Sequence, residues 1–136
     1  MKTYFNIQEL IPRHLFAIFG LEKSWNFVNK RAFENLVKFR EYVGKPMIIN
    51  DCFLGGIKNW SGLRTAGSPY FKSTSQHSFG NAYDIISPDI TPEELQEIVK
   101  EKYKLFEIGG LEVNVGWLHV DWRYDRAGEL SIFTKG

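Results

Sequence analysis

The sequence is poor in the residues that build disulfide networks and cysteine-rich metal clusters. Its 136 residues include one cysteine, Cys52, and three histidines, His14, His77 and His119. A disulfide within the chain needs two cysteines, so none can form, and a metal site would have to use histidine and carboxylate ligands. We expect Cys52 to be a small buried residue and His14 to be a surface or packing residue.

A charge excess and long apolar runs are also missing. Seventeen basic residues stand against sixteen acidic ones, which gives a formal net charge of +1. Nucleic-acid binders and polybasic membrane binders usually carry a clear basic excess, so we expect neither activity. No stretch approaches the roughly 20 apolar residues of a membrane span, and the first residues lack the apolar run of a secretory signal. We expect a monomer that is made in the cytosol.

Apolar and aromatic residues, at 43% and 15% of the chain, are sufficient for a single folded domain over residues 1–136. The pattern predicts an α+β fold, with helices packed on one face of a small, mainly antiparallel sheet. The expected elements are two short helices within 7–28 broken by Pro12 and Gly20, a helix over 30–43, a strand over 46–50, a long loop over 51–76, a strand over 81–86, a helix that begins after Thr91, a hairpin of 111–113 and 117–123, and a last strand over 130–133.

The predicted strand 117–123 alternates between two kinds of side chain. One face carries Leu118, Val120 and Trp122, and we expect it to point to the core. The other face carries Trp117, His119, Asp121 and Arg123. Taken alone, this second face is more often a polar surface than a functional site.

Residues 75–84 change that interpretation. His77 ends a loop rich in serine and threonine, and Asp84 lies seven residues later inside a predicted strand. A charge in a strand is costly unless it is paired or bound to a metal. Together with His119 these residues form a His-Asp-His set. Three protein ligands with a fourth position open to water are typical of catalytic zinc, and this mixture of ligands suits zinc better than calcium.

The same residues resemble a known family. The pattern reads Ser75-x-His77-x-x-Gly80-x-Ala82-x-Asp84, followed by Trp117-x-His119, and an upstream element reads Ser61-Gly62-Leu63-Arg64. It resembles the zinc D-alanyl-D-alanine carboxypeptidases and the related L-alanyl-D-glutamate endopeptidases of peptidoglycan, which share their fold with the hedgehog signalling domain. The resemblance runs from about residue 45 to residue 124.

This resemblance implies a zinc peptidase that cuts peptidoglycan stem peptides. It implies His77, Asp84 and His119 as zinc ligands. Arg64 would bind the substrate carboxylate or polarise the scissile carbonyl, because a planar guanidinium suits either task. Ser75 would contact the substrate or a neighbouring loop, and Trp117 would contact the substrate. The short form without a signal peptide looks like versions encoded by bacteriophages, which reach the cell wall by holin-type release, as endolysins do, or as part of a virion.

The general base is where the sequence departs from the family. Many members place a glutamate three residues before the last histidine, and here that position is Gly116. If Val115 and Gly116 are the two turn residues of the hairpin, Glu112 falls opposite His119, about 5 Å away at Cβ, and can serve as the base. If the turn holds three residues, Glu112 faces Leu118 instead.

Asp121 is the other candidate for the base, because it lies on the same face of the strand as His119. We expect it rather to orient a ligand or to pair with Arg64 or Arg123.

Three functions remain open at this stage. The first is an active zinc peptidase, with the cleaved bond undetermined. The second is a non-catalytic zinc module that binds peptidoglycan or builds a virion, which the glycine at position 116 favours. The third, a metal-free interaction domain, requires the His-Asp-His set to be a coincidence.

Overall fold

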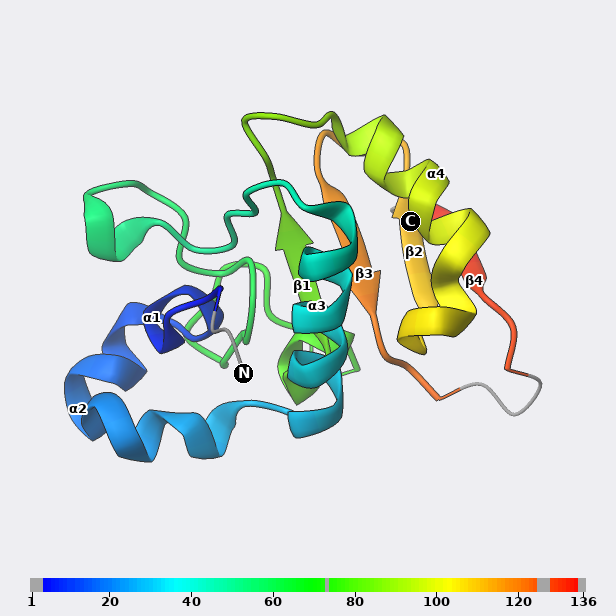
Figure 1. Cartoon of the computed structure of the whole chain (residues 1–136). Helices are drawn as coiled ribbons and strands as arrows, with labels where there is room; N and C mark the ends of the chain where they lie inside the picture. Colours follow the sequence, from blue (N-terminus) through cyan, green and yellow to red (C-terminus); the bar gives the residue numbers. More distant parts are fainter. Residues whose placement is uncertain (1–3, 73, 125–127, 135–136) are drawn as a thin grey trace.

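The computed structural model describes residues 4–72, 74–124 and 128–134. Its sheet consists of β1 (Ala82–Ile85), β2 (Gly110–Val113), β3 (Leu118–Asp121) and β4 (Ser131–Thr134), in the spatial order β1-β3-β2-β4 (Figure 1). β3 pairs antiparallel with β1 and β2, whereas β4 runs parallel to β2. The predicted α+β class with a mainly antiparallel sheet is confirmed.

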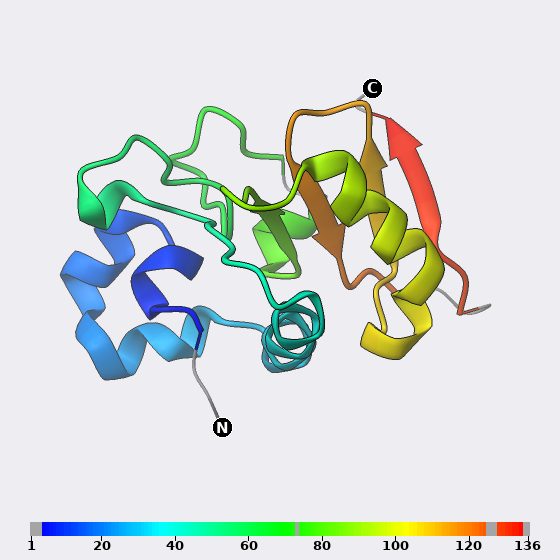
Figure 2. The same ribbon diagram turned by 45° about the horizontal axis from the view of Figure 1, so that its top comes forward.

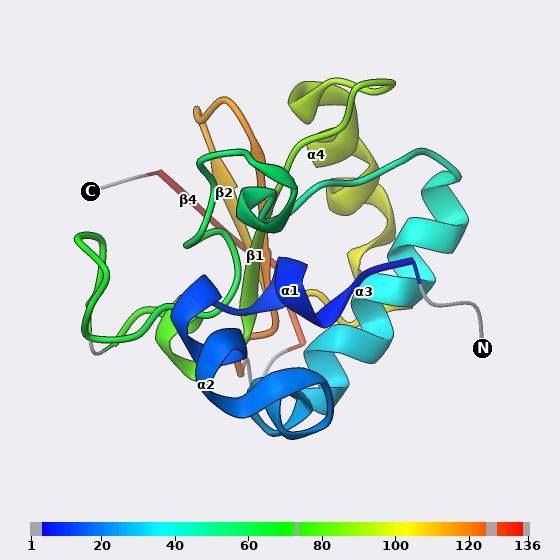
Figure 3. The same cartoon turned by 90° about the vertical axis from the view of Figure 1, so that its left-hand side faces the viewer.

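The helices occupy two places around this sheet. They are α1 (Ile7–Leu10), α2 (Arg13–Lys23), α3 (Lys30–Val43) and α4 (Pro92–Lys102). α3 and α4 lie on one face of the sheet, and α1 and α2 lie beside its β1 edge (Figure 2). Seen from that edge, the loop that leads toward residues 76–79 lies on the opposite side of the sheet from α3 and α4 (Figure 3). Among the described residues, no helix is long and apolar enough to cross a membrane.

α3 has the limits that the sequence predicts. The side chain of Asn29 accepts a hydrogen bond from the backbone N–H of Ala32 (2.9 Å) and caps the first turn. Gly44 ends the helix in a left-handed conformation (φ +70°), which glycine adopts without steric cost. Leu36 and Phe39 have no exposed surface and hold α3 against the core.

α4 also begins where its sequence signals place it. Thr91 Oγ1 accepts a hydrogen bond from the backbone N–H of Glu94 (3.1 Å), and Pro92 occupies the first helical position. Leu95 and Val99 are fully buried against the sheet side of the helix.

The core lies between this pair of helices and one face of the sheet. The strand residues that point into it are Tyr83, Ile85, Leu111, Leu118 and Val120. Burying an aliphatic side chain of this size contributes about 1.5–3 kcal/mol. Since side chains alternate along a strand, the residues between them must point to the other face. That face carries the candidate site.

One expectation needs correction. Residues 46–50 form a single bridge, Ile48 to Ile86, rather than a strand, because the chain then turns toward α1, where Asn50 N donates to Glu9 O (3.2 Å). Gly20 (φ +76°, ψ −173°) has a non-helical conformation and interrupts α2 where the sequence predicts a break. Gly110 is the first residue of β2.

Candidate metal centre

The strand register brings three functional side chains into one row. Asp84 on β1 is the partner of His119 on β3, and His119 is also the partner of Glu112 on β2. All three lie on the face of the sheet that is opposite to α3 and α4. This is the register expected for a hairpin whose two turn residues are Val115 and Gly116, so Glu112 does not face Leu118.

His77 reaches this row from a short 3-10 helix, Gln76–Phe79. Ser75 Oγ accepts a hydrogen bond from His77 N (3.3 Å) and caps this turn, and Gly80 (φ +70°) ends it. The backbone N–H of Arg64 donates to His77 O (3.0 Å), and Asp84 N donates to Ser61 O (2.7 Å). The 61–64 segment is therefore tied to both the turn and β1, and the Ser75 hydroxyl shapes the turn that carries His77.

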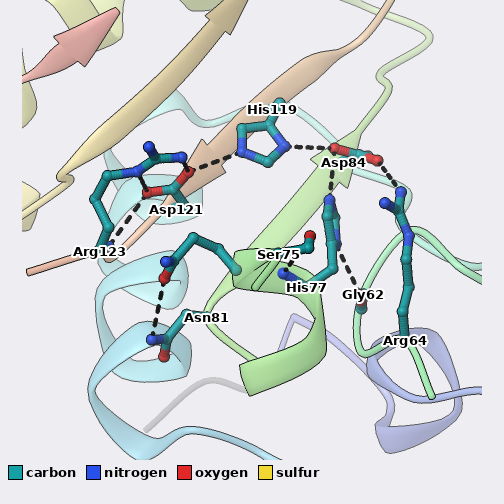
Figure 4. Close-up of polar contacts among 10 residues, drawn as sticks. Gly62, Arg64, Ser75, His77, Asn81, Asp84, His119, Asp121 and Arg123 are labelled. Carbon is teal, nitrogen blue, oxygen red and sulfur yellow. Dashed lines mark hydrogen bonds and ion pairs between the residues drawn. The ribbon is translucent and has the colours of Figure 1, made fainter. Parts of the chain in front are cut away.

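His77, Asp84 and His119 form a group that could hold a metal ion. Their potential ligand atoms all lie within 4.8 Å of one another. Asp84 Oδ1 is 2.9 Å from His119 Nδ1 and 3.3 Å from His77 Nε2 (Figure 4). The two imidazoles are buried, with 3% of His77 and 6% of His119 exposed. The fold thus brings together the three residues that the resemblance implies as ligands.

The two histidines present opposite ring nitrogens to this group. His77 Nδ1 donates to the carbonyl oxygen of Gly62 (2.8 Å), which turns Nε2 toward Asp84. His119 Nε2 bonds Asp121 Oδ2 (2.9 Å), which turns Nδ1 toward Asp84. Metal-binding histidines commonly donate their second N–H to a carbonyl or a carboxylate in this way.

The spacing of the ligand atoms is compatible with a bound metal ion. Ligand atoms bound at about 2.0 Å in tetrahedral geometry are about 3.3 Å apart; Asp84 Oδ1 lies 2.9 Å from His119 Nδ1 and 3.3 Å from His77 Nε2, and all three atoms lie within 4.8 Å of one another. The neutral ring of His77, which donates from Nδ1 to Gly62 O, directs the lone pair of Nε2 at Asp84 Oδ1. Two acceptor atoms that face each other in this way are stabilised by a cation between them.

Charge interactions within the group shift several pKa values. Burial alone would lower the pKa of His119, but hydrogen bonds to Asp121 and Asp84 outweigh it and raise the pKa to about 9. Burial alone would raise the pKa of Asp84, yet the hydrogen bond from His119, together with the nearby ring of His77, holds it well below its usual range. The pKa of Asp121 falls to about 2, because hydrogen bonds from Arg123 and His119 outweigh its burial. At neutral pH the ring of His119 is a cation between two carboxylates.

Asp121 is fully buried and has both oxygens engaged. Arg123 Nε donates to Oδ1 (2.8 Å) and Arg123 Nη2 to Oδ2 (2.6 Å), and Oδ2 also bonds His119. Asp121 therefore pairs with Arg123 and not with Arg64. These contacts place it to orient His119 and leave it little capacity to accept a further proton.

Arg64 lies on the opposite side of the group. Its Nη2 donates to Asp84 Oδ2 (3.0 Å) and its Nε to Trp60 O (2.7 Å), while its guanidinium lies 5.7 Å from the ring centre of Tyr70. Burial lowers the pKa of Arg64, and the charges of Asp84 and Glu112 oppose that decrease. Arg64 thus binds Oδ2 of Asp84, while the two histidines face Oδ1.

The side chains of Glu112 and Trp117 lack hydrogen-bond partners among the described residues. Glu112 is half-buried and makes no hydrogen bond or ion pair with any residue that the structure describes. Trp117 lies in the loop before β3, with its Nε1 buried and without a partner among the same residues. The part-exposed carboxylate of Glu112 is therefore accessible to another molecule, whereas the Trp117 N–H is a buried donor without a partner among the described residues.

Two neighbours of the group lie outside the site that the sequence predicts. The ring of Phe133 on β4 lies 5.5 Å from the ring of His119, and a Cβ added at Gly110 would collide with the carboxylate of Asp121. Alternation within the last strand gives a weak signal for Phe133, whereas nothing local points to Gly110. His14, whose ring lies 5.9 Å from that of Trp60, and the buried Cys52 both lie outside the group.

Comparisons with known proteins identify no relative of this chain. No family model, curated protein or solved structure matches this chain. The assignment of a function therefore depends on the geometry of the site and on the residues that carry the resemblance.

Proposed function

We propose that this protein is a zinc-dependent peptidase that hydrolyses stem-peptide bonds of peptidoglycan. The observation that carries the proposal is the meeting of His77, Asp84 and His119, with Glu112 opposite His119 on the neighbouring strand and without a hydrogen bond to any described residue. The substrate class comes from the resemblance to the carboxypeptidases and endopeptidases of the cell wall. As in the phage-encoded forms, the protein would reach the wall by holin-type release or as part of a virion.

His77 Nε2, Asp84 Oδ1 and His119 Nδ1 are the atoms that would hold the zinc ion. When bound, zinc supplies a Lewis acid for the scissile carbonyl and makes a nearby water more acidic. The hydrogen bonds from His77 to Gly62 and from His119 to Asp121 keep the two rings in the orientation that binding needs.

Glu112 is the group that moves the proton. Its carboxylate accepts a proton from the attacking water and then delivers it to the nitrogen of the leaving amine. It can do so without first breaking a hydrogen bond, because it makes none with the described residues. Asp121 would have to give up bonds to Arg123 or His119 to take the same role.

Arg64 would bind an oxygen atom of the substrate, in its scissile carbonyl or in a terminal carboxylate. Nη2 and Nε are engaged by Asp84 and Trp60, which fix the plane of the guanidinium. Nη1 donates to no group in the described part of the chain. It can therefore donate to the scissile carbonyl or to a terminal carboxylate, as a rigid planar group suits such oxygens.

Replacing Arg64 with lysine should lower kcat/KM about 10- to 100-fold, because a charge-assisted hydrogen bond contributes about 1.5–3 kcal/mol. Lysine keeps the charge, but it cannot bond Asp84, Trp60 and the substrate in one plane. At saturating zinc, the zinc content measured by elemental analysis should equal the parental value, although zinc affinity should fall because Arg64 also bonds Asp84. Arg13→Lys, on an exposed residue of α2, is the matched control, and unaltered turnover of Arg64→Lys would remove this residue from the site.

The proposal is tested by mass spectrometry of muropeptides after incubation with the zinc-loaded protein. Release of terminal D-alanine indicates a carboxypeptidase, and a cut between L-alanine and D-glutamate indicates an endopeptidase. Zinc binding without any cleavage would instead support a non-catalytic wall-binding or virion module, the alternative that Gly116 favours. Failure to take up zinc would contradict both functions.

A further inference from the structure

We infer that Arg123 and Phe133 are positioning residues of the metal centre, which act through Asp121 to fix the ring orientation of His119. The inference rests on the metal site of the proposed function and does not depend on peptidase activity. It assigns a role at the site to the C-terminal strand, β4, which lies outside the segment that resembles the family.

The first step is the contact between Arg123 and Asp121. Two parallel hydrogen bonds, Nε to Oδ1 (2.8 Å) and Nη2 to Oδ2 (2.6 Å), fix the plane of the carboxylate, and Arg123 N adds a third to Oδ1 (3.2 Å). A carboxylate held in this way cannot rotate about its Cβ–Cγ bond. Oδ2 is consequently directed at His119 Nε2, 2.9 Å away (Figure 4).

The second step is the bond from Asp121 to His119. An acceptor fixed at Nε2 requires that nitrogen to keep its proton, and Nδ1 is then the nitrogen that faces Asp84. If the carboxylate could turn away, the imidazole could flip and present the wrong nitrogen to the metal. The Arg123–Asp121 pair therefore selects the ligand atom of His119.

The third step is the ring of Phe133. The guanidinium carbon of Arg123 lies 4.4 Å from the centre of this ring, and the His119 ring meets it edge-on at 5.5 Å. Because 30% of the Arg123 side chain is exposed, water competes for its guanidinium, and the cation–π contact holds it in place. Phe133 is paired in register with Glu112, so it extends the row of site residues onto β4.

The fourth step is the space left by a missing side chain. Gly110 on β2 is the register partner of Asp121, and a Cβ at this position would overlap the Asp121 carboxylate. Glycine thus leaves room for the carboxylate between β2 and Arg123. Arg123 therefore fixes the Asp121 carboxylate directly, Gly110 leaves the space for it, and Phe133 acts through Arg123.

The test compares zinc affinity with the stability of the metal-free protein. We expect Arg123→Lys, Phe133→Leu and Gly110→Ala each to weaken zinc binding about 10- to 100-fold in competition with a chelator, the usual effect of losing a group behind a metal ligand. For Arg123→Lys and Phe133→Leu, the Tm of the metal-free protein should change by only a few degrees. Ile132→Ala is the matched control, because Ile132 lies on the same strand, is 51% exposed and points to the other face.

Nitrogen NMR of the zinc-loaded protein supplies a second readout. In the parent, His119 should be bound through Nδ1 with a protonated Nε2, and His77 should show the reverse pattern, which makes it an internal reference. In Arg123→Lys and Phe133→Leu, the Nε2 proton of His119 should exchange faster with water while that of His77 Nδ1 is unchanged. A merely structural role would disturb both histidines or neither.

The outcomes separate the inference from the proposed function. Parental zinc affinity and an unchanged His119 spectrum in both Arg123→Lys and Phe133→Leu would overturn the inference, even if muropeptides are cleaved. Weakened zinc binding in these variants supports it, even if no muropeptide is cleaved and the peptidase proposal fails. A parent protein that binds no zinc would overturn both.

Discussion

Replacing Glu112 with glutamine is expected to lower the turnover of the zinc-loaded protein about 100-fold or more, with its zinc content unchanged. Glutamine keeps the shape of the side chain and its hydrogen-bonding capacity but cannot accept a proton at neutral pH. Glu112 lies opposite His119 in the β2–β3 register and has no hydrogen bond to any described residue that proton transfer would have to break. The measurement is kcat on a defined muropeptide, together with zinc content by elemental analysis.

The effects of Asp121→Asn on zinc affinity and turnover should be compared with those of Glu112→Gln. Since Asp121 orients His119 through a buried hydrogen bond and is itself held by Arg123, its loss should reduce zinc affinity more than turnover at saturating zinc. An exposed glutamate of α4, changed in Glu93→Gln, controls for a general effect of lost charge. A fully active Glu112→Gln together with an inactive, zinc-loaded Asp121→Asn would reverse the two assignments.

The row of site residues could be predicted because it depends on local periodicity. Side chains alternate along a strand, so residues 117–123 separate at once into core residues and a second, polar face. A short turn then fixes which residue of the preceding strand faces His119, and the observed partner is Glu112. The sequence leaves open whether that turn holds two or three residues. A three-residue turn would place Glu112 opposite Leu118 and so out of the row.

His77 and Arg64 depend on contacts that are distant in the sequence. The loop that carries Arg64 reaches His77 through the backbone bond from Arg64 N to His77 O, and it reaches β1 through Asp84 N to Ser61 O. Periodicity cannot reveal such bonds, and the resemblance supplied the pairing of these segments. It did not supply the bond from Arg64 to Asp84, which a buried carboxylate requires to offset its desolvation.

Phe133, Gly110 and the 46–50 segment show where sequence patterns are insufficient. β4 could be predicted as a strand, but its parallel place beside β2, which brings Phe133 to His119, is set by the tertiary fold. The glycine at 110 looks like a turn residue until its neighbour Asp121 is known. The apolar run at 46–50 looks like a strand, but its last residue, Asn50, bonds the α1 segment instead of a strand.

Zinc should raise the Tm of the parent protein, and His119→Ala should abolish this rise. A ligand that binds only the folded state at 1,000 times its Kd adds about 4 kcal/mol to the free energy of unfolding. For a chain of this size, that amount raises Tm by roughly 10–15 °C. His119 supplies one of three ligand atoms, and the remaining pair, His77 and Asp84, should bind zinc far more weakly.

Alanine at position 119 also changes the metal-free protein, because the His119 ring is a cation between Asp84 and Asp121 at neutral pH. Its removal leaves Asp84 held by Arg64 and His77, and Asp121 held by Arg123, at a cost of about 3–5 kcal/mol. The zinc-induced change in Tm of each variant, rather than its absolute Tm, is therefore the quantity to compare.

His119→Gln keeps a polar side chain between the two carboxylates and removes the imidazole ligand, so it should fold even where alanine does not. His14→Ala is the matched control, because its ring packs near Trp60 and lies outside the metal-binding group. Calorimetric scans with and without zinc should show the full rise in Tm for the parent and His14→Ala, and little or none for the two variants at position 119. Parental zinc affinity in His119→Gln would mean that the ion binds elsewhere, because a site built on His77, Asp84 and His119 cannot lose one of its imidazoles without loss of affinity.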